Sequence, residues 1–371
     1  MAALQWLAVD LLTGTIICEL PGLITTQPYK RTLGQYETQS VNLAVVPGVT
    51  ADEWPRATLP GAAALIAVRG DPGQEVIHWG GVVLRRTRTV RSNLVSLDLA
   101  TVECYLDRRF TGAYTATNRS QNLVVADLIA QFVAANQGLP VAVVDVTPAG
   151  ATIPTISPTF YDYDDKAVYS TIGGLSSVVG GPEWTGHWTW NRGPNTITPV
   201  IYTGNRIGQP TTGVAPGVTF DSANLIDGTL VEDYGKPSGS GSGGGGANDV
   251  LATFGQGLGR LTAPSTSVGT DGRPRWQYRF SPATSLTDTT VLQAQATNAL
   301  AVLGSGSGTV TLQSSATAGP VLGSDWNLGD DIGYELTGTA FPTPVTGIAR
   351  AIGYETDDTY TSPILYVPGV A

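Results

Sequence analysis

Alternation of apolar and polar positions predicts a chain built mostly of β-strands. Before residue 110, short apolar runs are separated by turn clusters such as Pro60-Gly61 and Gly70-Asp71-Pro72-Gly73. Apolar runs bounded by Gly, Pro and Asn are typical of strands, and a series of them with short turns indicates a small barrel or sandwich. Residues 1–112 are therefore predicted to form a first β-barrel. Its predicted strands are 5–11, 15–20, 41–46, 62–68, 75–86 and 94–106.

The pattern changes to helical spacing after Arg119. One helix is predicted behind Ser120, which suits a helix N-cap. A second helix is predicted after residues 161–165, whose aspartates favour a helix N-terminus. Residues 113–196 are therefore expected to form a small α/β domain. The apolar stripes are Val125, Leu128, Ile129 and Phe132 in the first helix, and Val168, Ile172, Leu175 and Val179 in the second.

The stretch GGPEWTGHWTW, residues 180–190, holds three of the eight tryptophans of the chain. Trp184, Trp188 and Trp190 alternate with polar residues, and this period of two predicts a strand with one apolar face. The favoured interpretation is that these rings are buried beneath the two helices. The alternative is an exposed platform on which a sugar could stack, formed by the same three tryptophans. A catalytic role is disfavoured because no carboxylate pair or second histidine is nearby in the sequence.

Strand patterns return after residue 197 and predict a second β-barrel, formed by residues 197–255 and 308–371. The Gly/Ser-rich segment 235–247 interrupts it with a composition typical of flexible chain. A strand pattern resumes at Asp249, so we interpret this segment as a mobile loop between two strands, with a true interdomain linker as the alternative. Disorder is expected from Pro237 to Gly246. The predicted strands are 198–202, 219–220, 225–234, 249–254, 308–312, 331–336, 347–354 and 362–367.

Residues 256–307 are predicted to be an inserted strand-helix subdomain. Ser285 and Asp288 have the spacing of a capping box, with Asp in place of Glu. Gly304 suits the position after the last helical turn. The apolar stripe of this helix is Leu292, Ala296, Ala299, Leu300 and Leu303.

Composition narrows the choice of partners. Charged residues make up only 13% of the 371 residues and the net charge is −10. A surface covered by partner proteins and a surface coated with uncharged polar residues are both consistent with so few charges. No basic stripe is long enough to follow a phosphate backbone, which argues against nucleic acid. The one basic run, residues 84–91, is interpreted as a solvated strand or a salt-bridge surface between subunits.

Candidate chemistry is sparse, and we expect no catalytic residue, no metal ligand, no cofactor and no enzyme activity. Cys18 and Cys104 are too few for a zinc site or a disulfide framework. His78 and His187 are far apart in the sequence, and no G-x-S-x-G motif accompanies them. Asp330 and Asp331 are adjacent and would point to opposite faces of a strand. The N-terminal segment lacks the features of a signal peptide, and no membrane span is expected.

Four stretches together resemble one known family. They are ECYLDRR at 103–109 followed by SQNLVVADLI at 120–129, YSTI at 169–172 through GPEWT at 181–185, ANDVLATFGQG at 247–257, and WNLGDD at 326–331 followed by GIARAIGYE at 347–355. In this order they resemble the minor tail proteins of siphophages that infect actinobacteria, of the type that forms the tail-tip or baseplate hub.

The resemblance implies a β-rich α+β fold with two small barrels related to tail-tube domains, a small α/β domain and a strand-helix decoration. It also implies a homotrimer that closes the distal end of the tail tube within the virion, after assembly in the host cytoplasm. The implied partners are the distal tail protein, the tape measure protein and other minor tail proteins, with phage DNA only in transit through the channel. Two alternatives are a carbohydrate-binding receptor module of the tail tip and the distal tail adaptor.

Overall fold

Strands dominate the computed structural model, with 48% of residues in strands and 14% in helices, which confirms a β-rich fold. Contacts divide the chain into two compact units, residues 1–226 with 313–363, and residues 227–312 with 364–371. The four-part domain division made from the sequence remains a prediction. The structure describes residues 4–25, 27–48, 50–71, 73–133, 138–148, 150–151, 154–176, 181–211, 215–235, 245–254, 261–269, 272–281, 289–316 and 318–368.

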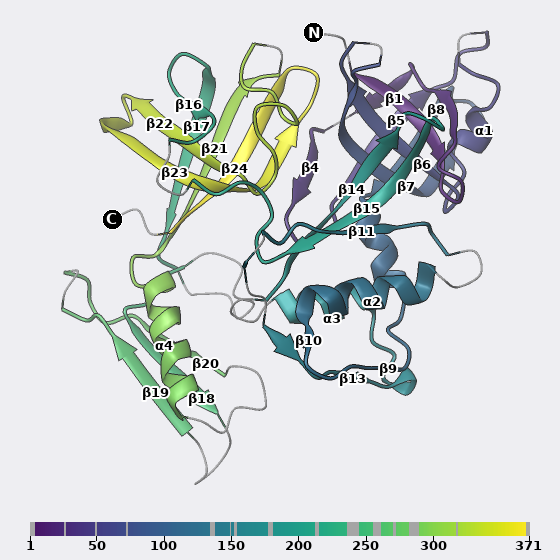
Figure 1. The fold of residues 1–371 in the computed structure, drawn as a ribbon. Helices are drawn as coiled ribbons and strands as arrows, with labels where there is room; N and C mark the ends of the chain where they lie inside the picture. The colour runs from purple at the N-terminus through teal and green to yellow at the C-terminus, as the bar shows by residue number, and fades with distance from the viewer. Residues whose placement is uncertain are drawn as a thin grey trace. The chain divides into compact units, whose positions relative to one another are not determined.

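The first large sheet has seven strands (Figure 1). Its third strand has the sequence AALIAVR, in which all seven residues are buried. Alternate residues point to opposite faces, so Leu65 enters one core with Trp6 and Trp79, and Ile66 enters another with Trp188. The pairing order is β2 (Ile16–Glu19), β1 (Gln5–Asp10), β6 (Ala63–Arg69), β7 (Val76–Arg88), β8 (Leu94–Ala100), β5 (Thr38–Ala44) and β3 (Leu23–Thr25), with the short helix α1 (Trp54–Ala57) beside them.

Three aromatic rings fill the first of these cores. Trp6, Tyr29 and Trp79 lie with their ring centroids 6.1 to 6.2 Å apart. The indole nitrogen of Trp79 donates to the Lys30 carbonyl at 3.0 Å. Tyr29 and Lys30 belong to β4 (Tyr29–Thr32), which pairs with β23 (Phe341–Thr356) of the second large sheet. Strand β4, from the N-terminal region, therefore pairs with the second large sheet, while the ring of its residue Tyr29 packs in a core of the first large sheet.

Two helices cover the sheet that contains the tryptophan-rich stretch (Figure 1). Both predicted helices are present, as α2 (Gln121–Val133) and α3 (Val168–Ser176), and all four predicted stripe residues of α2 are buried. The sheet has the order β11 (Ala142–Asp145), β15 (Thr196–Gly204) and β14 (Glu183–Asn191). Smaller elements complete this part: β9 (Tyr114–Thr115), β10 (Arg119–Ser120), β12 (Thr155–Ile156), β13 (Thr159–Phe160) and the 3-10 helices η1 (Val102–Arg108) and η2 (Asp162–Asp164).

The second large sheet is built mainly from C-terminal strands. Its core includes Phe220, Trp326 and Tyr354. The Trp326 ring contacts each of the other two edge to face, with ring centroids 6.2 Å apart. In the described part of the chain neither large sheet closes on itself, so the two predicted barrels are seen as open sheets. The pairing order is β16 (Thr219–Phe220), β22 (Asp331–Gly338), β23, β24 (Tyr360–Pro368), β21 (Ser307–Ser315) and β17 (Leu225–Asp233), and β4 also pairs with the end of β23.

A small sheet with one helix makes up most of the second compact unit. The helix α4 (Thr289–Leu303) packs Leu292 and Ala296 against Ala252 and Phe280. The pairing order is β19 (Leu261–Thr266), β18 (Asp249–Phe254) and β20 (Gln277–Phe280), so the strand at 249–254 lies here and not among the strands of the second large sheet. The predicted cap at Ser285 and most of the Gly/Ser-rich segment lie outside the described residues.

A close approach between β7 and β14 provides a test of this packing. A side chain added at Gly80 would place its first carbon 2.4 Å from the Trp188 ring. We expect Gly80→Ala to destabilise the protein by about 1 to 3 kcal/mol, the usual cost of overpacking a core. Denaturant unfolding would measure this cost. Gly173→Ala in α3 is the matched control, because open space surrounds that position and alanine favours a helix; equal effects of the two variants would contradict the packing.

Candidate functional site

The tryptophan strand β14 lies at the centre of the first compact unit, and its apolar face is buried. Trp184 and Trp188 are only 1% and 3% exposed. Trp184 contacts the Tyr169 ring of α3 edge to face at 5.5 Å. Trp190 is half-buried and carries the Arg192 guanidinium 3.6 Å above its ring. The favoured interpretation of a buried strand agrees with this burial, whereas a sugar platform made of all three rings does not, because two of them have no free face.

On the opposite face of β14, Thr185 and His187 contact one buried arginine, whereas Thr189 and Asn191 further along are exposed. Arg31 of β4 is 6% exposed and donates to the Thr185 hydroxyl at 2.8 Å. It also donates to Nδ1 of His187 at 2.9 Å and pairs with Glu103 of η1 at 3.5 Å. The Glu103 carboxylate, itself 1% exposed, accepts the Gly186 backbone N–H at 2.7 Å. One cation therefore joins β4, η1 and β14.

This arginine fixes the protonation of His187. A guanidinium only donates, so Nδ1 of His187 must accept and the ring must be neutral. Burial, then Arg31 and His78, lower the pKa of His187 to about 3. Burial and Arg69 lower the pKa of His78 to about 4. The two histidines, distant in the sequence, thus interact electrostatically, and both are held in the neutral form that does not add charge beside the arginines.

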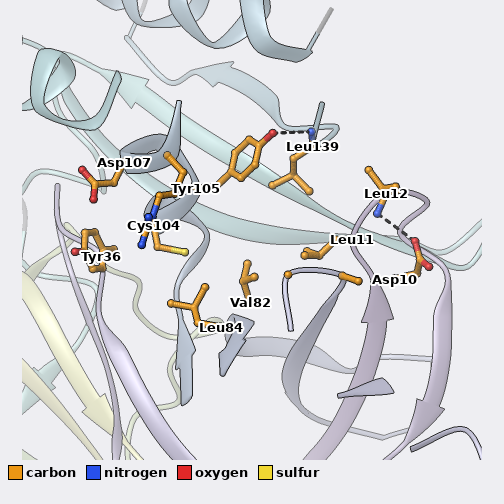
Figure 2. Close-up of a pocket in the computed structure, with 13 residues that line it drawn as sticks. Asp10, Leu11, Leu12, Tyr36, Val82, Leu84, Cys104, Tyr105, Asp107 and Leu139 are labelled. Atoms are coloured by element: carbon orange, nitrogen blue, oxygen red, sulfur yellow. Dashed lines mark hydrogen bonds between the residues drawn. The ribbon is translucent and has the colours of Figure 1, made fainter. Parts of the chain in front are cut away.

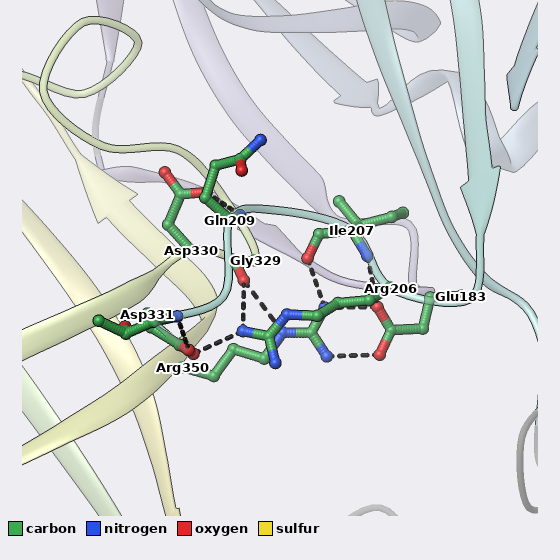
Figure 3. Close-up of polar contacts among 9 residues, drawn as sticks. Glu183, Arg206, Ile207, Gln209, Gly329, Asp330, Asp331 and Arg350 are labelled. Carbon is green, nitrogen blue, oxygen red and sulfur yellow. Dashed lines mark hydrogen bonds and ion pairs between the residues drawn. The ribbon is translucent and has the colours of Figure 1, made fainter. Parts of the chain in front are cut away.

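A second cluster of contacts, centred on Arg350, lies at the start of β14 (Figure 3). Arg350 of β23 pairs through two nitrogens with the two carboxylate oxygens of Glu183. It also donates to the carbonyl oxygens of Ile207 at 2.7 Å and Gly329 at 3.1 Å. Glu183 in turn accepts the Ile207 backbone N–H at 2.7 Å. The paired guanidinium and carboxylate thereby hold the segment after β15 against the second large sheet.

The same segment passes so close to the second sheet that only glycine fits. A first side-chain carbon on Gly208 would lie 2.0 Å from the Gly329 carbonyl carbon, and both residues have φ values in the left-handed region, 84° and 94°. Asp330 and Asp331 then bind the segment from the sheet side. Asp330 accepts the backbone N–H of Gln209 at 2.7 Å, and Asp331 accepts that of Thr211 at 2.7 Å.

Asp331 also pairs with Arg206 at 2.5 Å. Burial raises its pKa, but the hydrogen bond from the Thr211 backbone and the contacts with Arg206 lower it further, and the net change is downward. The two adjacent aspartates therefore accept hydrogen bonds from a neighbouring loop.

A pocket of about 540 Å³ opens beside the first large sheet (Figure 2). Apolar side chains including Leu11, Val82 and Leu84 line it, and Asp10 and Asp107 lie toward opposite ends. Its one thiol is Cys104, whose pKa is raised to about 12 by burial and by Glu103. That thiol stays protonated and is a poor nucleophile at neutral pH. The pocket is thus an apolar recess without an activated group.

The described residues contain no cluster of three or more side chains suited to hold a metal ion. Asp162, Asp164 and Asp165 lie in or beside η2, directly before α3, as the sequence indicated. No helix in the described ranges is long and apolar enough to cross a membrane.

Sequence reasoning missed Arg31 and Glu103, the residues that join β4, η1 and β14. Arg31 lies in a four-residue strand without visible periodicity, and Glu103 lies in a segment predicted to be the end of a strand. The available signal was a single charge between Val102 and Cys104 in a chain with few charges. A charge in an apolar run is rarely buried unless it is paired.

No protein-family model matches the sequence, and no curated protein matches it either. The fold, however, matches solved structures over nearly the full chain. The tail protein from Neisseria meningitidis MC58 is 14% identical, with a TM-score of 0.60 and coverage of 99% of this chain and 97% of that chain. The 43 kDa tail protein of prophage MuSo2 from Shewanella oneidensis is 11% identical, with a TM-score of 0.60 and coverage of 98% of each chain.

Prophage tail protein gp18 from Listeria monocytogenes EGD-e is similar at 10% identity and a TM-score of 0.52, covering 99% of this chain and 95% of that chain. At these identities the likeness establishes a shared fold. The chain has the β-rich fold of phage tail proteins from one end to the other.

The buried pair of Arg31 and Glu103 should be required for stability. Arg31→Met would leave the Glu103 carboxylate buried without its cation, and we expect a loss of about 3 to 5 kcal/mol in the free energy of unfolding. Adding Glu103→Gln should recover part of this loss because no lone charge remains. Arg56→Met, at a side chain that is 64% exposed, should cost less than about 0.5 kcal/mol. Urea denaturation of the three variants and the wild type would decide, and similar losses for Arg31→Met and Arg56→Met would contradict the role of the pair.

Buried neutral His78 should make the protein acid-sensitive. Its pKa falls from 6.5 to about 4 on folding, so between these values the unfolded chain binds more protons and stability decreases as the pH falls. At about 1.4 kcal/mol per pKa unit, the full effect of this group is about 3 kcal/mol. We expect His78→Gln to flatten the dependence of unfolding free energy on pH between 4 and 6.5 by about one proton. Equal slopes for variant and wild type would show that His78 is not held neutral.

Proposed function

We propose that the chain is a structural component of a phage tail tip, where it acts as a trimeric hub. The hub would close the distal end of the tail tube and connect it to the tape measure and receptor-binding proteins during DNA ejection. The observation that carries the proposal is the match of nearly the whole chain to three tail proteins, at TM-scores from 0.52 to 0.60. The match covers 95% or more of each of those proteins, so it includes their whole architecture.

Contacts between the second large sheet and β14 support this role. Arg31 and Arg350 lie on neighbouring strands of the second sheet region and both bind side chains or backbone near β14. A hub must transmit force without separating its parts, and buried charge pairs fix one arrangement of the elements that they join. Two sheets in each subunit would give six in a trimer, which suits contact with a sixfold tube.

The proposed partners are further copies of this chain, the distal tail protein, the tape measure protein and other minor tail proteins. Phage DNA would contact the hub only in transit, which suits a net charge of −10 because like charge weakens nonspecific binding to phosphates. We place the protein in the virion, after assembly in the host cytoplasm. We also propose that it is not an enzyme, and the protonated Cys104 thiol in an apolar pocket supports this.

The burial of Trp184 and Trp188 argues against a carbohydrate-binding module built on these rings. A distal tail adaptor would share a structural role and would differ in its symmetry. The number of subunits therefore separates the hub from its nearest alternative.

The mass of the assembled protein tests the proposal. One chain weighs 38.6 kDa, so we expect a species of about 116 kDa by light scattering on a size-exclusion column, with three-fold rings in negative stain. A six-subunit ring of about 232 kDa would instead identify the adaptor. Measurement over a range of protein concentrations is the control for nonspecific association, which would give masses that keep rising. A chain that stays monomeric at 100 µM would contradict the hub.

A further inference from the structure

We propose that the β7–β8 hairpin of one copy docks along the edge strand β17 of a second copy. The inference rests on the proposed hub function and identifies the surfaces through which the subunits would meet. It joins the one strongly basic projection of the chain to a strand that is exposed, acidic and at the end of its sheet.

The hairpin is exposed along its whole tip. Every residue from Thr87 to Leu94 is exposed, and Val90 has no protection from solvent. Within the described part of the chain, no ion pair or hydrogen bond holds the side chains of Arg88 and Arg91, while Arg85 has only a 3.8 Å contact with the exposed Asp98. Arginine is enriched at protein interfaces, so two unpaired guanidinium groups on one exposed hairpin suit a surface that binds a partner.

The root of the hairpin is fixed, although its tip is free. The Arg86 guanidinium donates to the Pro55 carbonyl at 2.6 Å and to the Thr58 hydroxyl at 3.0 Å. At the same point the pairing of β7 and β8 shifts register between Val83 and Arg85. A projection anchored in this way presents its tip in one orientation, which lowers the entropic cost of docking.

Strand β17 has complementary properties. None of its nine residues is buried, and it ends the strand order of the second large sheet. Asp227 and Asp233 lie on the same side of the strand as the exposed Val231, because residues two apart share a face. Glu232, on the other side, has no ion-pair partner among the described residues.

A second copy is the occupant that fits both surfaces. An exposed strand at a sheet edge is a template for pairing unless it is covered. Here the two surfaces carry opposite charge, and each offers one exposed valine. Because hairpin and edge strand are different surfaces, a contact between them is heterologous, and repeating it generates a ring when the rotation closes.

Charge reversal on each side and on both sides tests the contact. We expect Arg88→Glu with Arg91→Glu to raise the concentration needed for half-assembly at least tenfold at 150 mM NaCl, and Asp227→Arg with Glu232→Arg to do the same. Combining the four substitutions should restore assembly to within about threefold of the wild type. The control variant, Lys166→Glu with Arg275→Glu, changes net charge by the same four units at exposed sites elsewhere and should assemble normally.

Each outcome has a definite reading. A wild-type trimer that survives both reversals would overturn this inference and leave the hub intact. A wild-type chain that is monomeric at 100 µM would overturn both. Loss of binding to a 30-base-pair DNA duplex in the hairpin variant, with unchanged self-assembly, would assign the hairpin to nucleic acid and overturn the proposed contact. Circular dichroism of each variant confirms that the fold is retained.

Discussion

The structure depends on burying a guanidinium that cannot lose its charge. Arg31 is nearly inaccessible, so every polar atom around it must accept. The surrounding groups meet this demand with a carboxylate from η1, a hydroxyl and a neutral imidazole from β14. A shift of β14 by one residue would replace Thr185 and His187 with Gly186 and one flanking tryptophan, Trp184 or Trp188, on the arginine side. The buried cation therefore selects one register for β14.

Arginine side chains that bind carboxylates or backbone carbonyls recur where other segments meet. Arg350 binds the Glu183 carboxylate and two backbone carbonyls. Arg69 of β6 donates to the carbonyl oxygens of Ala316 and Asp357 at 3.3 and 3.2 Å. Backbone carbonyls at loops have no strand partner, and an arginine can satisfy several of them together because its donors form a rigid fork. Arg31 and Arg69 are buried in this way, at 6% and 5% exposure, although the chain has only 20 basic residues.

Local patterns were enough to predict the helices and most strands, but not the contacts of Arg31 and Glu103 that join β4, η1 and β14. The stripe of α2 was readable because its spacing is a property of consecutive residues. The segment 94–106 was predicted as one strand, yet β8 ends at Ala100 and η1 follows. The chain turns there because Glu103 reaches the Gly186 backbone N–H and Arg31. These partners are 83 and 72 residues away, and no local periodicity reports contacts of that range.

The tryptophan stretch shows the same limit from another side. Period two correctly indicated a strand with a buried ring face, but it carried no information about what the other face contacts. Thr185 on that face contacts Arg31, which arrives from β4, a strand that pairs with β23. Which polar positions of a strand face water depends on strand order, and order is fixed by long-range pairing.

The distribution of charge links this interior to assembly. A chain with a net charge of −10 repels its own copies, so association needs positive charge at the contact. Internal clasps hold Arg31, Arg69 and Arg350, and two arginines that are unpaired among the described residues, Arg88 and Arg91, lie together on the exposed tip of the β7–β8 hairpin. Charge that is concentrated at one projection attracts a neighbour in one orientation, whereas the same charge spread evenly would not. In the proposed contact, the basic hairpin therefore sets the direction in which copies join.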